Sequence, residues 1–112
     1  MTERPRSINR VMISGDVEDR IHYGSTPSST SACSFYLLAH TPPFSDTRVK
    51  INCYGAGLVN VCKRFLSVGS HVLIEGELLN RQDREGSVEV RAHRIIFYNL
   101  NEEEDDSASK PT

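Results

Sequence analysis

The chain of 112 residues contains no tryptophan, and its aromatic residues are limited to four tyrosines and four phenylalanines. It lacks any apolar run of about 18 residues, which excludes a membrane-spanning helix. Its first residues, MTERPRSINR, are polar and basic, unlike a secretory signal. With 38% hydrophobic and 25% charged residues, the composition is typical of one globular domain with no membrane partner.

Residues that could form a catalytic or metal centre are present but not suitably spaced. The four histidines are scattered and form no HExxH motif, and there is no glycine-rich phosphate-binding loop. The cysteines Cys33, Cys53 and Cys62 are odd in number, and no two have the short spacing of zinc ligands. We therefore predict small core or surface thiols of a reducing compartment, with no metal, no cofactor and no enzyme activity.

The net charge of −2 is unevenly distributed. Residues 101–112 hold five acidic residues and one lysine, a charge of −4, so residues 1–100 keep 12 basic and 10 acidic residues, a charge of +2. A block of like charge usually stays solvated. We predict a flexible N-terminus over 1–7, one domain over 8–100 and a disordered acidic tail over 101–112.

Period-two alternation predicts the strands of the N-terminal half. From Asn9 onwards the apolar residues alternate with polar ones, and Gly15 indicates a bulge or sharp bend. The Gly/Ser/Thr/Pro-rich segment 21–32 is expected to be a loop, and 33–39 a second strand. The prolines of 41–47 predict another loop before a third strand over 48–55.

A change of period then predicts one helix. In 56–68 the residues Leu58, Val61, Cys62 and Phe65 follow helical spacing and form the apolar face of an amphipathic helix, which we expect to be buried, and Gly69 is the expected C′ residue that stops the helix. Strands over 71–78 and 88–100 follow, joined by a turn over 80–87 in which Gly86 supplies a positive φ. This order is typical of an all-β, five-stranded Greek-key OB-fold barrel with one short helix between strands 3 and 4.

Three segments also carry a family likeness: INRVMISGDVEDR (8–20), VKINCYGAGLVNVCKRFLSVGSHVLIEGEL (49–78) and EVRAHRIIFYNL (89–100). Together they resemble the bacterial and mitochondrial single-stranded DNA-binding protein family. The resemblance implies non-catalytic protection of single strands in replication or repair, by base stacking and phosphate contacts. It further implies a homo-oligomer, a tetramer or dimer, located in the cytoplasm and nucleoid or in the mitochondrial matrix.

The candidate nucleic-acid-binding residues are aromatic side chains for stacking and basic side chains for phosphate. The resemblance places Phe44 and Tyr54 at stacking positions, and places Arg48 and Asp83 where bacterial members often have tryptophans. An arginine can still stack on a base, whereas an aspartate repels phosphate. The full set comprises Arg10, Tyr23, Tyr36, Phe44, Arg48, Lys50, Tyr54, Arg81, Arg84 and Arg91.

The missing tryptophans lead us to expect weaker binding than in a typical bacterial member. The expected partners are single-stranded DNA or RNA and replication, repair or RNA-processing proteins. One alternative is an OB-fold adaptor subunit of a larger nucleoprotein complex, similar to primosomal or RNA-editing subunits, with weak intrinsic binding. Another is a structural OB module that binds no nucleic acid.

Overall fold

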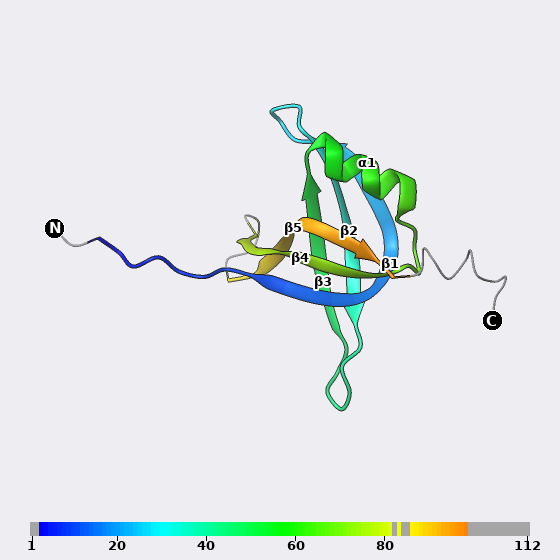
Figure 1. Ribbon diagram of the computed structural model, residues 1–112, viewed down its shortest axis with the longest axis horizontal. Coiled ribbons are helices and arrows are strands. Elements are labelled where there is room, and N and C mark those ends of the chain that lie inside the picture. The colour runs from blue at the N-terminus through cyan, green and yellow to red at the C-terminus, as the bar shows by residue number, and fades with distance from the viewer. Residues whose placement is uncertain (1–2, 82, 84–85, 99–112) are drawn as a thin grey trace.

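Five strands form a closed barrel, with one helix outside it, in the computed structural model, which describes residues 3–81, 83 and 86–98 (Figure 1). The elements are β1 (Val11–Ser25), β2 (Ser31–Ala39), β3 (Thr47–Tyr54), α1 (Ala56–Phe65), β4 (His71–Asn80) and β5 (Val88–Phe97). The strand order around the barrel is β1-β2-β3-β5-β4, and β3 and β5 form the parallel pair. This confirms the predicted OB-fold architecture.

The long, curved strand β1 closes the barrel by pairing on both sides. Residues 11–16 pair with β4, and 16–25 pair with β2. Gly15 lies where β1 passes from one partner to the other, and a Cβ atom there would lie 2.3 Å from the carbonyl oxygen of Leu38. The close approach of the two backbones therefore requires glycine at this position.

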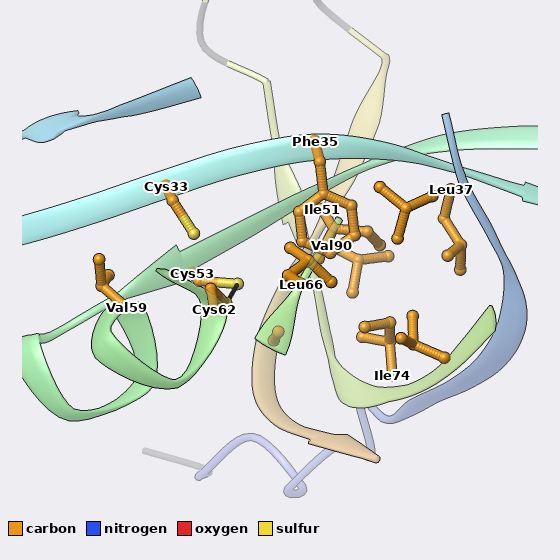
Figure 2. Close-up of a cluster of buried hydrophobic side chains, with 13 residues drawn as sticks. Cys33, Phe35, Leu37, Ile51, Cys53, Val59, Cys62, Leu66, Ile74 and Val90 are labelled. Carbon is orange, nitrogen blue, oxygen red and sulfur yellow. Dashed lines mark hydrogen bonds between the residues drawn. The ribbon is translucent and has the colours of Figure 1, made fainter. Parts of the chain in front are cut away.

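Alternating residues of the strands fill the barrel interior (Figure 2). Phe35 and Leu37 of β2, Ile51 of β3 and Ile74 of β4 are at most 1% exposed. Burying each such side chain contributes roughly 1.5–3 kcal/mol. All three cysteines are free and buried. The sequence predicted either core or surface thiols, and the structure confirms the core location.

The predicted loop over 21–32 is wrong at both ends. β1 continues to Ser25 and β2 begins at Ser31, so that the connection is limited to 26–30. The register pairs His22 with Ser34 and Gly24 with Ala32. Pairing with β2 outweighs the low strand propensity of glycine and serine, because each strand then supplies partners for the backbone N–H and C=O groups of the other.

The helix α1 lies over one end of the barrel, beside the β1–β2 connection (Figure 1). Its buried residues are Val59 and Cys62, whereas Val61 and Phe65 are 37% and 40% exposed. The predicted buried face is therefore correct at Cys62 and wrong at Val61 and Phe65. No helix of the described segments is long and apolar enough to cross a membrane.

The predicted helix stop at Gly69 is also wrong. The helix ends at Phe65, and Leu66 is its C-cap in an extended conformation that takes the side chain into the core. Gly69 has the expected positive φ of 94°, but its N–H donates to the carbonyl oxygen of Val17 at 2.8 Å. Its conformation therefore serves the turn that leads into β4.

Candidate nucleic-acid interface

The residues between the core positions of β2, β3 and β5 point outward and form one continuous surface. Cross-strand register places Tyr36 beside Lys50, Leu38 beside Arg48, and Asn52 beside Arg91. Facing residues of neighbouring strands share one side of the sheet. We call this surface the outer face; its residues are Ser34, Tyr36, Arg48, Lys50, Asn52, Tyr54, Glu89 and Arg91.

Arg48 and Tyr36 form a stacked pair on the outer face. The Arg48 guanidinium carbon lies 3.9 Å from the centroid of the Tyr36 ring. Its Nε lies 3.0 Å from Glu18 Oε1, and its second amino group lies 3.3 Å from Asp19 Oδ2. Two carboxylates thus hold the guanidinium over the Tyr36 ring, and its other side can receive a planar group.

Glu89 organises the middle of the outer face. Its carboxylate accepts a hydrogen bond from the Asn52 amide and lies 3.3 Å from Arg81 Nε and 3.9 Å from Lys50 Nζ. Arg81 also donates to Asp83, at 2.8 Å, and this hydrogen bond raises the pKa of Arg81. Arg81 and Lys50 therefore meet at one half-buried carboxylate.

The parallel contact of β3 and β5 brings Arg91 next to Tyr54. The Arg91 guanidinium carbon lies 5.9 Å from the Tyr54 ring centroid, and one of its amino groups lies 3.5 Å from Glu77 Oε2. Tyr54 is 38% exposed. An exposed aromatic ring beside an arginine provides both a stacking surface and a charge for phosphate.

The charge of this surface is balanced rather than basic. Arg48, Lys50, Arg81 and Arg91 each lie within 4.0 Å of at least one carboxylate. The carboxylates involved are Glu18, Asp19, Glu77, Asp83 and Glu89. A phosphate that reaches these four cations must therefore compete with five protein carboxylates.

A cleft of about 250 Å³ opens beside Tyr54. One row of the sheet holds His22, Ser34 and Asn52, and the next holds Gly24, Ala32 and Tyr54. The small residues of β1 and β2 leave space between the larger side chains of the two rows. The cleft holds several times the volume of one water molecule, which is about 30 Å³ in the liquid, so a planar ring has room against Tyr54.

The sequence reasoning missed His22, Ser34 and Asn52 as lining residues. The predicted loop over 21–32 hid the register that aligns His22 with the two others. Period-two alternation in 21–25 could have indicated it, since Ile21 and Tyr23 alternate with His22 and Gly24. Asn52 is 7% exposed and was passed over because it carries no charge and no aromatic ring.

Six of the ten predicted residues converge, three lie elsewhere, and one falls outside the described residues. Tyr36, Arg48, Lys50, Tyr54 and Arg91 lie on the outer face, and Arg81 reaches it through Glu89.

Three of the predicted residues lie away from the outer face. Tyr23 lines the cleft but faces Cys33 on the side covered by α1, where Lys63 Nζ is 5.7 Å from its ring. Phe44 is 79% exposed in the β2–β3 connection. Arg10 lines a separate cleft of about 520 Å³ with residues of β1, β4 and β5. Arg84 lies outside the described residues.

Comparison with protein-family models and with curated proteins gave no match for the sequence. Among solved structures, the chain is similar to an SSB domain from Synechococcus, with 15% identity, a TM-score of 0.68 and coverage of 83% of this chain and 99% of that one. It is similar to the Plasmodium falciparum SSB in complex with ssDNA, with 17% identity, a TM-score of 0.71 and coverage of 86% and 99%.

A third similar structure is the dimeric N-terminal domain of PriB from Thermoanaerobacter tencongensis. Its identity is 21%, its TM-score is 0.66, and the match covers 80% of this chain and 96% of that one. These likenesses establish that the chain has the barrel fold that single-stranded DNA-binding proteins use.

Proposed function

We propose that this chain is a non-catalytic single-stranded nucleic-acid-binding protein whose outer face holds the strand. The convergence of Tyr36, Arg48, Lys50, Tyr54 and Arg91 on one side of the barrel carries this proposal. The similar fold of the SSB in complex with ssDNA supports it. The role that fits best is the protection of exposed strands in replication or repair.

The mechanism combines two stacking positions with phosphate contacts for which the protein carboxylates compete. One base lies against Tyr54 in the cleft, and a second lies on the Arg48–Tyr36 pair. Stacking contributes about 1–3 kcal/mol per base with little sequence preference. Lys50 and Arg91 then reach phosphates by exchanging their carboxylate partners for the strand.

A second candidate function is that of an adaptor subunit in a larger nucleoprotein complex. The specific observation in its favour is the pairing of every cation of the outer face with a carboxylate. The similarity to a PriB domain also supports it. An adaptor would bind single strands weakly alone and would need a protein partner for its activity.

We further propose that a second copy of the chain packs against the outer side of β1. The Asn9 side chain donates to the Leu78 carbonyl oxygen at 2.9 Å and accepts from its N–H at 2.8 Å, which fixes this segment beside β4. Ile8 and Met12 on either side are 91% and 69% exposed. Light scattering of the wild-type chain and of Met12→Glu tests this, and a monomeric wild type would contradict it.

The test of the leading proposal is a fluorescence-anisotropy titration of labelled dT and U oligomers of about 30 nucleotides, with a duplex as control. We expect salt-dependent, sub-micromolar binding to single strands and not to duplex. Tyr54→Ala should weaken binding by about 1–3 kcal/mol with the fold intact. Dissociation constants in the range of tens of micromolar would instead favour the adaptor.

The matched control is Tyr98→Ala. Tyr98 is 46% exposed, close to the 38% of Tyr54, but it stacks on His71 away from the outer face. Its replacement removes the same side chain from a different wall of the barrel and should leave the affinity unchanged. An equal loss in both variants would remove Tyr54 from the proposed site.

A further inference from the structure

Three cysteine sulfurs from three different elements meet under α1. Cys33 of β2 and Cys53 of β3 face each other across the antiparallel pair, and Cys62 approaches them from the helix (Figure 2). The three Sγ atoms lie within 4.8 Å of one another, and Cys62 Sγ is 4.0 Å from Cys53 Sγ. The three cysteines are at most 3% exposed.

These distances match the edge of a three-coordinate thiolate site. A metal–sulfur bond of about 2.3 Å in a trigonal plane gives a sulfur–sulfur edge of about 4.0 Å. The Cys53–Cys62 pair has this separation, and Cys33 needs to move by less than an ångström to complete the triangle. Ordinary core packing requires only that cysteines be small and apolar, and does not require three sulfurs to converge.

We propose that Cys33, Cys53 and Cys62 form a binding site for one soft monovalent cation of the copper(I) type. Thiolate ligands select copper(I) and zinc over harder ions. Structural zinc sites are closed by four ligands, and no fourth histidine, cysteine, aspartate or glutamate of the described residues joins the cluster. Three sulfurs without a fourth donor therefore favour copper(I).

The surroundings of the cluster supply a compensating charge. Binding replaces S–H bonds by metal–sulfur bonds and releases up to three protons to solvent, so the site becomes more negative. Lys63 follows Cys62 in the chain, and its Nζ lies 5.7 Å from the ring of Tyr23, the residue that faces Cys33. The Lys63 ammonium therefore lies on the same side of β1 and β2 as Cys33, where a positive charge stabilises an anionic cluster.

Opening of the helix provides a route for the ion. The cleft beside Tyr54 includes Cys33 in its lining, and α1 is a ten-residue helix whose N-cap, Gly55, makes no side-chain hydrogen bond. Short helices that lack a side-chain N-cap open more easily than the whole domain unfolds, although the Leu66 N–H caps the C-terminal end of α1 by donating to the Cys62 carbonyl oxygen. The cluster can therefore be loaded either through local opening of α1 or during folding.

The experiment titrates the full chain with copper(I) in the presence of bicinchoninate, both on the native protein and during refolding from denaturant. We expect one copper(I) per chain, a thiolate-to-copper charge-transfer band, and protection of all three thiols from alkylation. Zinc added alone should not give this protection. Failure of copper(I) to bind under both loading conditions, or zinc binding in its place, would overturn the proposal.

Variants separate the site from adventitious copper binding. Cys62→Ala should abolish stoichiometric uptake, whereas Val59→Ala, which removes a buried side chain from the same helix, should retain it. Circular dichroism checks that both variants fold. Full uptake by folded Cys62→Ala would overturn the assignment, and the alkylation result on the wild-type chain stands without any variant.

Discussion

Replacing Glu89 by glutamine should strengthen single-strand binding. The Glu89 carboxylate holds Lys50 at 3.9 Å and Arg81 at 3.3 Å, and it also accepts the amide of Asn52. Glutamine keeps an oxygen acceptor for Asn52 and removes the negative charge. Lys50 then loses the carboxylate beside it, and Arg81 loses one of its two and keeps its contact with Asp83.

The expected gain follows from Coulomb repulsion between this carboxylate and a phosphate bound by Lys50 and Arg81. At about 7 Å, two unit charges repel by about 0.6 kcal/mol in water and about 2.4 kcal/mol at an effective dielectric constant of about 20. Salt at about 0.1 M screens such charges over about 10 Å. We therefore expect binding to tighten about threefold to tenfold, or about 0.6–1.4 kcal/mol.

The assay is the anisotropy titration at two salt concentrations, with Glu75→Gln as the control. Glu75 lies on β4, pairs with Arg94 at 3.7 Å and lines the cleft that contains Arg10. Its replacement changes the net charge equally but on another wall of the barrel. Equal affinities of Glu89→Gln and Glu75→Gln, or weaker binding by Glu89→Gln, would refute the reasoning.

Three further results are expected. Gly76→Ala should destabilise the barrel by roughly 1–3 kcal/mol in urea unfolding, because its Cβ would lie 2.0 Å from the carbonyl oxygen of Arg91; unchanged stability would contradict this contact. Val59→Ala should lower the free energy of unfolding by roughly 1–3 kcal/mol and Val61→Ala by less than about 0.5 kcal/mol, because Val59 is 2% and Val61 is 37% exposed. The reverse order would support the helix face predicted from the sequence, in which Val61 is buried. Deleting 101–112 removes a charge of −4 and should tighten strand binding at low salt, and an unaffected titration would show that the tail does not repel the strand.

The element order and the outward positions of β3 could be predicted because they depend on local patterns. Alternation along 48–55 is sufficient to put Lys50 and Tyr54 opposite Ile51 and Cys53. The alternation in 21–25 is only a weak indication of a strand, because it is short and ends in Gly24 and Ser25, and pairing with β2 sets the full length of β1. Local sequence determines only those elements that need no distant partner.

The charge balance and the cysteine cluster were beyond sequence reasoning for a related reason. Glu18 and Arg48 are 30 positions apart, and Cys33 and Cys62 are 29 positions apart in the numbering. Each pairing depends on the order in which the strands close the barrel and on the register between them. A count of basic residues along the chain therefore overestimated the positive charge that the outer face presents.

The most direct test of the central claim maps the strand onto the barrel. In amide correlation spectra of the 15N-labelled chain titrated with a dT oligomer, we expect shift changes at Ser34, Tyr36, Lys50, Asn52 and Tyr54 on the outer face. Residues of α1 should change little. Shifts confined to α1 or to the β1–β4 wall, or no shifts at saturating oligomer, would contradict the proposal that the outer face binds single strands.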